Sequence, residues 1–134
     1  MFLFDTDTLS NIIRRKPPTT LLNKLIKIPL EQKFTTTITV GEMFYGAYKT
    51  PNPDYFLNQL SSHVWPTMNI LSFDKPSAQT YGKLRADLEK KGLTIGEPDL
   101  RIASITLING LTLVTGNVKH FERIPGLSIE NWLI

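Results

Sequence analysis

Residues 2–10 read FLFDTDTLS, and this stretch decides the fold class. Three apolar residues lead into Asp5, and hydroxyl and acidic residues follow before the next leucine. A short apolar run of this kind predicts a buried strand over 2–5. A helix should follow from about Thr8 to Arg15, because Pro17 stops any helix there. A strand that passes directly into a helix is typical of α/β proteins.

The same alternation continues to the end of the chain. Apolar residues at helical spacing predict helices over 20–28, 39–48 and 54–61. A long helix should follow its N-cap Asp74 and end at Gly92. A further helix should have Pro98 in its first turn and stop at Asn109-Gly110. The predicted strands cover 34–37 and 112–115, with 127–129 as an edge strand and 69–73 as a strand or an extended connection. This order predicts an α/β domain with a mainly parallel sheet.

Composition limits the class of protein further. A chain of 134 residues without repeats or linker-like segments predicts a single domain over 1–134. No apolar run is long enough for a membrane helix, and the N-terminus lacks the basic lead-in and cleavage site of a signal peptide. The absence of cysteine excludes disulfides and thiolate metal sites, which agrees with a cytoplasmic location. A net charge of +3 predicts no partner by itself.

Polar residues from four segments are expected at one edge of the sheet, because ligands of open α/β sheets bind beyond the carboxyl ends of the strands. Asp5 ends the first strand, and Asn117 follows the strand over 112–115. Glu42 and Asp99 come early in their helices. An acid at a helix N-terminus often only stabilises the helix dipole. Glu42, however, interrupts an apolar helix, where an unpaired carboxylate is costly.

Clustered carboxylates repel one another unless a cation neutralises them. Hard oxygen ligands select Mg²⁺ or Mn²⁺. Such ions lower the pKa of a bound water and hold a phosphoryl oxygen, so hydrolysis of a phosphodiester is the predicted chemistry.

The motifs that hold these acids also carry a family resemblance over nearly the whole chain. Residues 4–7 (FDTD) resemble the opening motif of PIN domains, and residues 38–46 (ITVGEMFYG) are similar to the second, Glu-bearing motif of that family. Residues 81–92 are similar to the long helix before its third motif, and residues 95–103 (IGEPDLRIA) resemble that motif. Residues 113–121 (LVTGNVKHF), followed by IPGL at 124–127, are similar to the C-terminal signature of the VapC toxins.

The resemblance implies a three-layer α/β/α PIN fold and a metal-dependent endoribonuclease, the toxin of a type II toxin–antitoxin pair. It assigns metal binding to Asp5, Glu42 and Asp99. The fourth position of the site, often Asp in the family, is Asn117 here and is expected to assist catalysis with one negative charge fewer. The resemblance further implies an RNA substrate, a homodimer and a small VapB-like antitoxin.

Other polar residues carry weaker signals. Asp7 is expected to cap the first helix, with a carboxylate contributed to the site as the alternative. Thr115 either bonds Asp5 or a metal-bound water, or satisfies the backbone. His120 is expected in a loop with a structural role. Several basic residues could contact RNA phosphates, although sequence alone does not place them on one face: Arg14, Arg15, Lys16, Lys119 and Arg123.

Two other functions fit part of the pattern. Asp5-Thr6-Asp7-Thr8 after an apolar strand also resembles the start of haloacid-dehalogenase-type phosphatases. Those enzymes need a late Lys and a late acidic pair, whereas only 19 residues follow Thr115, and they hold no such pair. The second alternative is a catalytically inert RNA- or protein-binding module that keeps the fold and has lost the metal, which Asn117 would favour.

Overall fold

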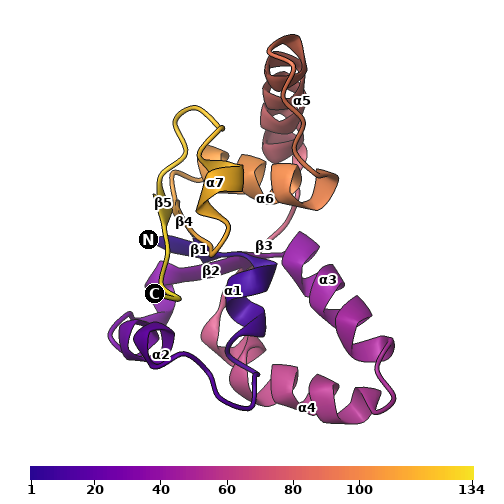
Figure 1. Ribbon diagram of the computed structural model, residues 1–134, viewed down its shortest axis with the longest axis vertical. Helices are drawn as coiled ribbons and strands as arrows, with labels where there is room; N and C mark the ends of the chain where they lie inside the picture. The colour runs from indigo at the N-terminus through magenta and orange to yellow at the C-terminus, as the bar shows by residue number, and fades with distance from the viewer.

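The computed structural model describes all 134 residues, and its centre is one five-stranded sheet in the order β3-β2-β1-β4-β5 (Figure 1). The strands are β1 (Phe2–Phe4), β2 (Lys33–Thr36), β3 (Asn69–Leu71), β4 (Thr112–Val114) and β5 (Ile129–Glu130). Every neighbouring pair is parallel. The first strand of the chain therefore lies in the middle of the sheet, and the predicted parallel α/β class is confirmed.

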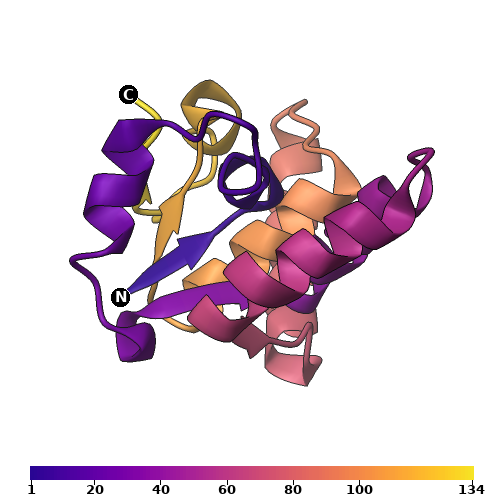
Figure 2. The ribbon, with the colours of Figure 1, turned by 90° about the horizontal axis from the view of Figure 1, so that it is seen from below.

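Seven helices connect and cover these strands (Figure 2). They are α1 (Thr6–Ser10), α2 (Thr19–Leu25), α3 (Thr37–Tyr48), α4 (Pro53–His63), α5 (Lys75–Lys90), α6 (Glu97–Ile108) and α7 (Val118–Phe121), with short 3₁₀ turns η1 (Leu30–Gln32) and η2 (Trp65–Thr67). None of the helices combines the length and apolar character that crossing a bilayer requires.

Two apolar cores, one on each face of the sheet, define three layers. Successive strand residues point to opposite faces, so Leu3 and Phe4 enter different cores, and both are completely buried. The core around Leu3 is built with α5, α6 and α7, and the core around Phe4 with α1, α2, α3, α4 and Trp132. Figure 1 shows α5 to α7 on one side of the sheet and α1 to α4 on the other. The predicted α/β/α layering is confirmed.

The ends of several elements differ from the prediction. Helix α1 begins at Thr6, because the Asp5 side chain caps it by accepting a hydrogen bond from Thr8 N at 2.9 Å. The prediction that Asp7 is the cap was therefore wrong, since Asp7 lies inside the first turn. The helix also ends at Ser10, well before the predicted Arg15.

The C-terminal part shows two further differences. Residues 118–121, expected as a loop around His120, form the short helix α7. The last strand is Ile129–Glu130 instead of 127–129, because Ile129 is the residue that aligns with Leu113 of β4.

The predicted ends of α5 and α6 are confirmed. Asp74 caps α5 by accepting from Ser77 N at 3.0 Å. Gly92 and Gly110 follow α5 and α6 with φ of 71° and 64°, the left-handed conformation that glycine adopts without a steric penalty.

Candidate active site

The carboxyl end of the central strand places Asp5 at the base of the site. Its side chain is almost completely buried, and it is held by Thr8 N at the start of α1. Burial raises the pKa of the Asp5 carboxyl, against the opposing effect of hydrogen bonds from Thr115 and Thr8. The one charged group that adds to this rise is the acid Asp7. Asp5 is thus a buried carboxyl with no cationic side chain to neutralise it.

The neighbouring strand β2 leads directly into α3, which carries Glu42. Thr36 ends that strand and caps α3 by accepting from Thr39 N at 3.1 Å. The Glu42 side chain is half-buried and accepts a hydrogen bond from Thr6 Oγ1, with 2.6 Å between Thr6 Oγ1 and Glu42 Oε1. Thr6 lies in the first turn of α1, so this bond joins the segments that follow β1 and β2. The protein group that the Glu42 carboxylate contacts is therefore a neutral hydroxyl.

Asp99 lies in the first turn of α6, on the opposite side of the sheet from α1 and α3. Its side chain is partly exposed, and its Oδ2 atom lies 3.1 Å from Nε2 of His120. Desolvation raises the pKa of Asp99, and His120 opposes this rise. The sequence pattern did not reveal this contact, because His120 follows Asp99 by 21 residues and belongs to a segment that was expected to be a loop.

Asn117 follows β4 through a tight turn. Thr115 Oγ1 accepts a hydrogen bond from Asn117 N at 3.0 Å. Gly116 lies between them, and a Cβ atom there would lie 2.7 Å from Leu133 Cδ1 and 2.9 Å from Asp7 Oδ2. Only glycine fits this turn without displacing a neighbour.

These segments enclose one cavity of about 620 Å³, lined by Asp5, Thr6, Asp7, Ser10, Glu42, Asp99, Gly116, Asn117 and Phe121. All four residues that the sequence singled out line this cavity. Thr6, Ser10 and Phe121 were missed, and Thr6 could have been noted as part of the FDTD motif. In this conformation no three acidic or histidine side chains are grouped tightly enough to hold a metal ion. Asp5, Glu42 and Asp99 instead each contact a protein group.

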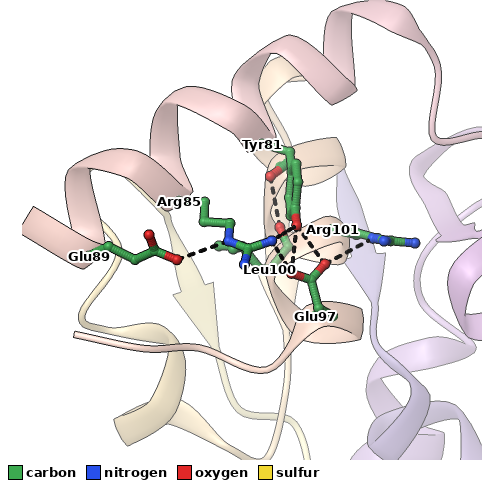
Figure 3. A network of polar contacts seen from close by, with 7 residues as sticks. Tyr81, Arg85, Glu89, Glu97, Leu100 and Arg101 are labelled. Atoms are coloured by element: carbon green, nitrogen blue, oxygen red, sulfur yellow. Dashed lines mark hydrogen bonds and ion pairs between the residues drawn. The ribbon is translucent and has the colours of Figure 1, made fainter. Parts of the chain in front are cut away.

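A polar network fixes the start of α6 just before Asp99 (Figure 3). Glu97 Oε1 lies 2.6 Å from the Tyr81 hydroxyl and 2.7 Å from Arg85 Nη1, both on α5. Its Oε2 lies 3.3 Å from Arg101 Nε, one turn further along α6. Hydrogen bonding from Tyr81, with the charges of Arg85 and Arg101, lowers the pKa of Glu97. Glu97 is therefore committed to joining α5 and α6, and it does not line the cavity.

The basic residues named from the sequence do not line the cavity. Arg14, Arg15, Lys16 and Lys119 are exposed, whereas Arg123 is partly buried and bonded within the protein.

Comparison with known proteins places this fold and cavity in a family. The PIN domain profile matches residues 2–127. Over 131 residues the chain is 33% identical to the tRNA(fMet)-specific endonuclease VapC of Salmonella typhimurium, covering 98% of this chain and 97% of that protein. The chain therefore belongs to the PIN-domain family and, within it, to the VapC ribonucleases.

Solved structures agree with this assignment. The crystal structure of VapBC2 from Rickettsia felis bound to a DNA fragment from their promoter contains a chain with a TM-score of 0.91 and 33% identity, with 98% of both chains covered. A toxin–antitoxin complex from Klebsiella pneumoniae contains one with a TM-score of 0.72 and 26% identity, again with 98% of both chains covered. The haloacid-dehalogenase-type alternative is wrong, since the matched family is the PIN domain.

Proposed function

We propose that this protein is a divalent-metal-dependent endoribonuclease and the toxin of a type II toxin–antitoxin pair. The observation that supports the chemistry best is the gathering of Asp5, Glu42 and Asp99 around one cavity at the carboxyl end of the sheet. The three acids come from three separate segments of the chain, and both faces of the sheet contribute to the set. Membership of the VapC ribonucleases supports RNA as the substrate.

The donor set fits a hard cation. The cavity offers carboxylate, hydroxyl and amide oxygens and no sulfur or histidine nitrogen in its lining, a set that favours Mg²⁺ or Mn²⁺. The buried Asp5 carboxyl, which lacks a cationic neighbour, is the group that gains most from an ion. Asp5, Glu42 and Asp99 would hold the ion, and Asn117 would assist as a neutral ligand. Once bound, the ion supplies an acidified water and stabilises charge on the phosphate.

The side chains around the acids orient them. The α1 N-terminus fixes Asp5 through Thr8, and Thr6 fixes Glu42 from the same turn. Thr115 holds the turn that brings Asn117 to the cavity. These hydrogen bonds restrain Asp5, Glu42 and the turn that carries Asn117 around one cavity, where an RNA phosphate would bind.

The biological setting follows from the family. We expect a small VapB-like antitoxin that blocks this cavity, a homodimer of the toxin, and a cytoplasmic location where the RNA substrate is found. These expectations can be checked by co-expression with the product of a neighbouring short reading frame, because a toxin should be poorly tolerated alone and should co-purify with its antitoxin.

The decisive experiment is a cleavage assay with near-isosteric variants. Asp5→Asn, Glu42→Gln and Asp99→Asn should each abolish cleavage of a fluorescent RNA in Mg²⁺ or Mn²⁺, and EDTA should stop the wild-type protein. Asp54→Asn and Glu31→Gln are matched controls, because both acids are exposed and neither lines the cavity. A folded wild-type protein that binds no ion and cleaves no RNA would support the inert-module alternative. Full RNA cleavage in EDTA would contradict the proposal that the reaction depends on a metal ion.

A further inference from the structure

The short helix α7 carries a histidine, and the turn after it an arginine, next to residues that line the cavity. His120 lies in α7 and packs edge-on against Phe121, with 5.4 Å between the ring centroids. Its backbone N–H donates to the carbonyl of Asn117 at 3.2 Å, so the histidine is tied to a residue of the cavity. Its Nε2 atom is buried and makes no other polar contact than the 3.1 Å approach to Asp99 Oδ2.

The neighbour of the second ring nitrogen decides which nitrogen carries the proton. Arg123 Nη2 lies 3.2 Å from Nδ1 of His120. A guanidinium can only donate hydrogen bonds, so this contact is a hydrogen bond when Nδ1 accepts and carries no proton. The proton of the neutral imidazole is then on Nε2, which faces Asp99. The imidazole therefore presents a donor to a carboxylate acceptor at 3.1 Å.

Arg123 is itself held in place from two sides. Its Nε donates to the carbonyl of His120 at 3.3 Å, and its Nη2 donates to the carbonyl of Thr94 at 3.1 Å. Thr94 lies in the connection between α5 and α6, just before the helix that carries Asp99. One arginine thus links α7, the histidine ring and the segment that leads into α6.

We propose that His120 is a positioning residue for Asp99: its Nε2–H holds the carboxylate toward the cavity, and Arg123 fixes the tautomer that makes this possible. This inference rests on the proposed function, because it assumes that Asp99 binds the ion. The approach to Asp99 does not meet hydrogen-bond geometry in this conformation, which leaves a buried N–H unsatisfied. A hydrogen bond from this N–H to the Asp99 carboxylate would remove that cost. Partners of this kind around a metal-binding carboxylate typically contribute tenfold to a hundredfold in metal affinity.

The test compares two amides at position 120. Glutamine can place an amide N–H near the position of Nε2, whereas asparagine reaches only the position of Nδ1. Both substitutions remove the ring from Phe121, so a purely structural role predicts the same effect for both. His63→Asn is the matched control, since His63 is the only other histidine and lies exposed at the end of α4.

The measurement is Mn²⁺ binding to the purified full chain by titration calorimetry, without RNA, alongside thermal unfolding in EDTA. We expect His120→Asn to weaken Mn²⁺ binding about tenfold or more, and His120→Gln and His63→Asn to bind as the wild type does. Arg123→Met, which keeps the histidine ring, should also weaken binding, and it serves as the second variant if His120→Asn does not fold.

The outcomes separate this inference from the proposed function. Equal losses for glutamine and asparagine, or wild-type affinity in both His120→Asn and Arg123→Met, would overturn the positioning role and leave the metal site intact. A wild-type protein that binds no Mn²⁺ would overturn both. Weaker Mn²⁺ binding by His120→Asn or Arg123→Met, together with wild-type Mn²⁺ binding by His120→Gln, supports the inference.

Discussion

Replacing Asp5 by Asn should make the protein more stable while it removes activity. The Asp5 carboxyl is buried, and that burial raises its pKa, so the charged form is disfavoured in the folded protein. An asparagine keeps the helix cap, because its side-chain oxygen can still accept from Thr8 N. The substitution therefore removes an uncompensated charge without removing the hydrogen bond. Stabilising changes of this kind contribute about 1 kcal/mol, or ~3–5 °C in Tm for a chain of this length.

The pH dependence gives the sharper part of this prediction. A carboxyl with a raised folded pKa binds its proton more tightly in the folded state than in the unfolded chain. Its destabilising effect is thus absent below the unfolded pKa, appears as the pH rises through that value, and is complete above the raised folded pKa. The Tm difference between Asp5→Asn and the wild type should be largest near neutral pH and should shrink toward pH 4.

Asp74 provides a matched control. It caps α5 with nearly the same geometry, 3.0 Å from Ser77 N against 2.9 Å from Thr8 N for Asp5. Asp74 is exposed, however, and hydrogen bonding from Ser77 lowers its pKa. Asp74→Asn should therefore not stabilise, and any stability that the charged Asp74 adds is present at neutral pH and lost as the pH falls.

The assay is thermal unfolding by circular dichroism between pH 4 and pH 8 in EDTA, repeated at neutral pH with Mg²⁺. The added ion should raise the Tm of the wild type and have little effect on Asp5→Asn, because an ion that binds only the folded site stabilises by mass action. A lower Tm for Asp5→Asn than for the wild type at neutral pH in EDTA would refute the reasoning. Equal changes in Tm, relative to the wild type, for Asp5→Asn and Asp74→Asn across this pH range would refute it too.

Three further predictions concern the turn after β4 and the start of α6. Asn117→Asp should lower the Mg²⁺ concentration that gives half-maximal RNA cleavage and Asn117→Ala should raise it, so coincident titration curves would remove Asn117 from the site. Gly116→Ala should lower the Tm and the cleavage rate, because its Cβ would collide with Leu133, whereas Gly82→Ala in α5, where the space is open, should raise stability by about 0.5–1 kcal/mol. Glu97→Gln should lower the Tm slightly, and the loss should shrink in high salt; a salt-independent loss would argue against a charged network.

Much of the fold could be predicted from local patterns. The run FLF followed by Asp5 identified the central strand, and Asp74 and Gly92 marked both ends of α5, because caps and left-handed glycines act within a few residues. Alternation of strands and helices was sufficient for the parallel α/β class. The predicted start of α1 was wrong because both Asp5 and Asp7 can cap a helix, and Asp5 is the residue that does. Helix α7 was not predicted because it is too short to show a helical period.

The four site residues could also be named from the sequence, because each follows a strand or opens a helix at the carboxyl edge of a parallel sheet. The structure brings Asp5, Glu42, Asp99 and Asn117 to one cavity. Their role in metal binding stays a prediction, as does the assignment of residues 1–134 to a single domain. Contacts between residues far apart in the chain could not be predicted from the sequence. These are the hydrogen bond from Thr6 to Glu42 and the approach of His120 to Asp99. They depend on how helices on both faces of the sheet pack against it, and no local propensity records that packing.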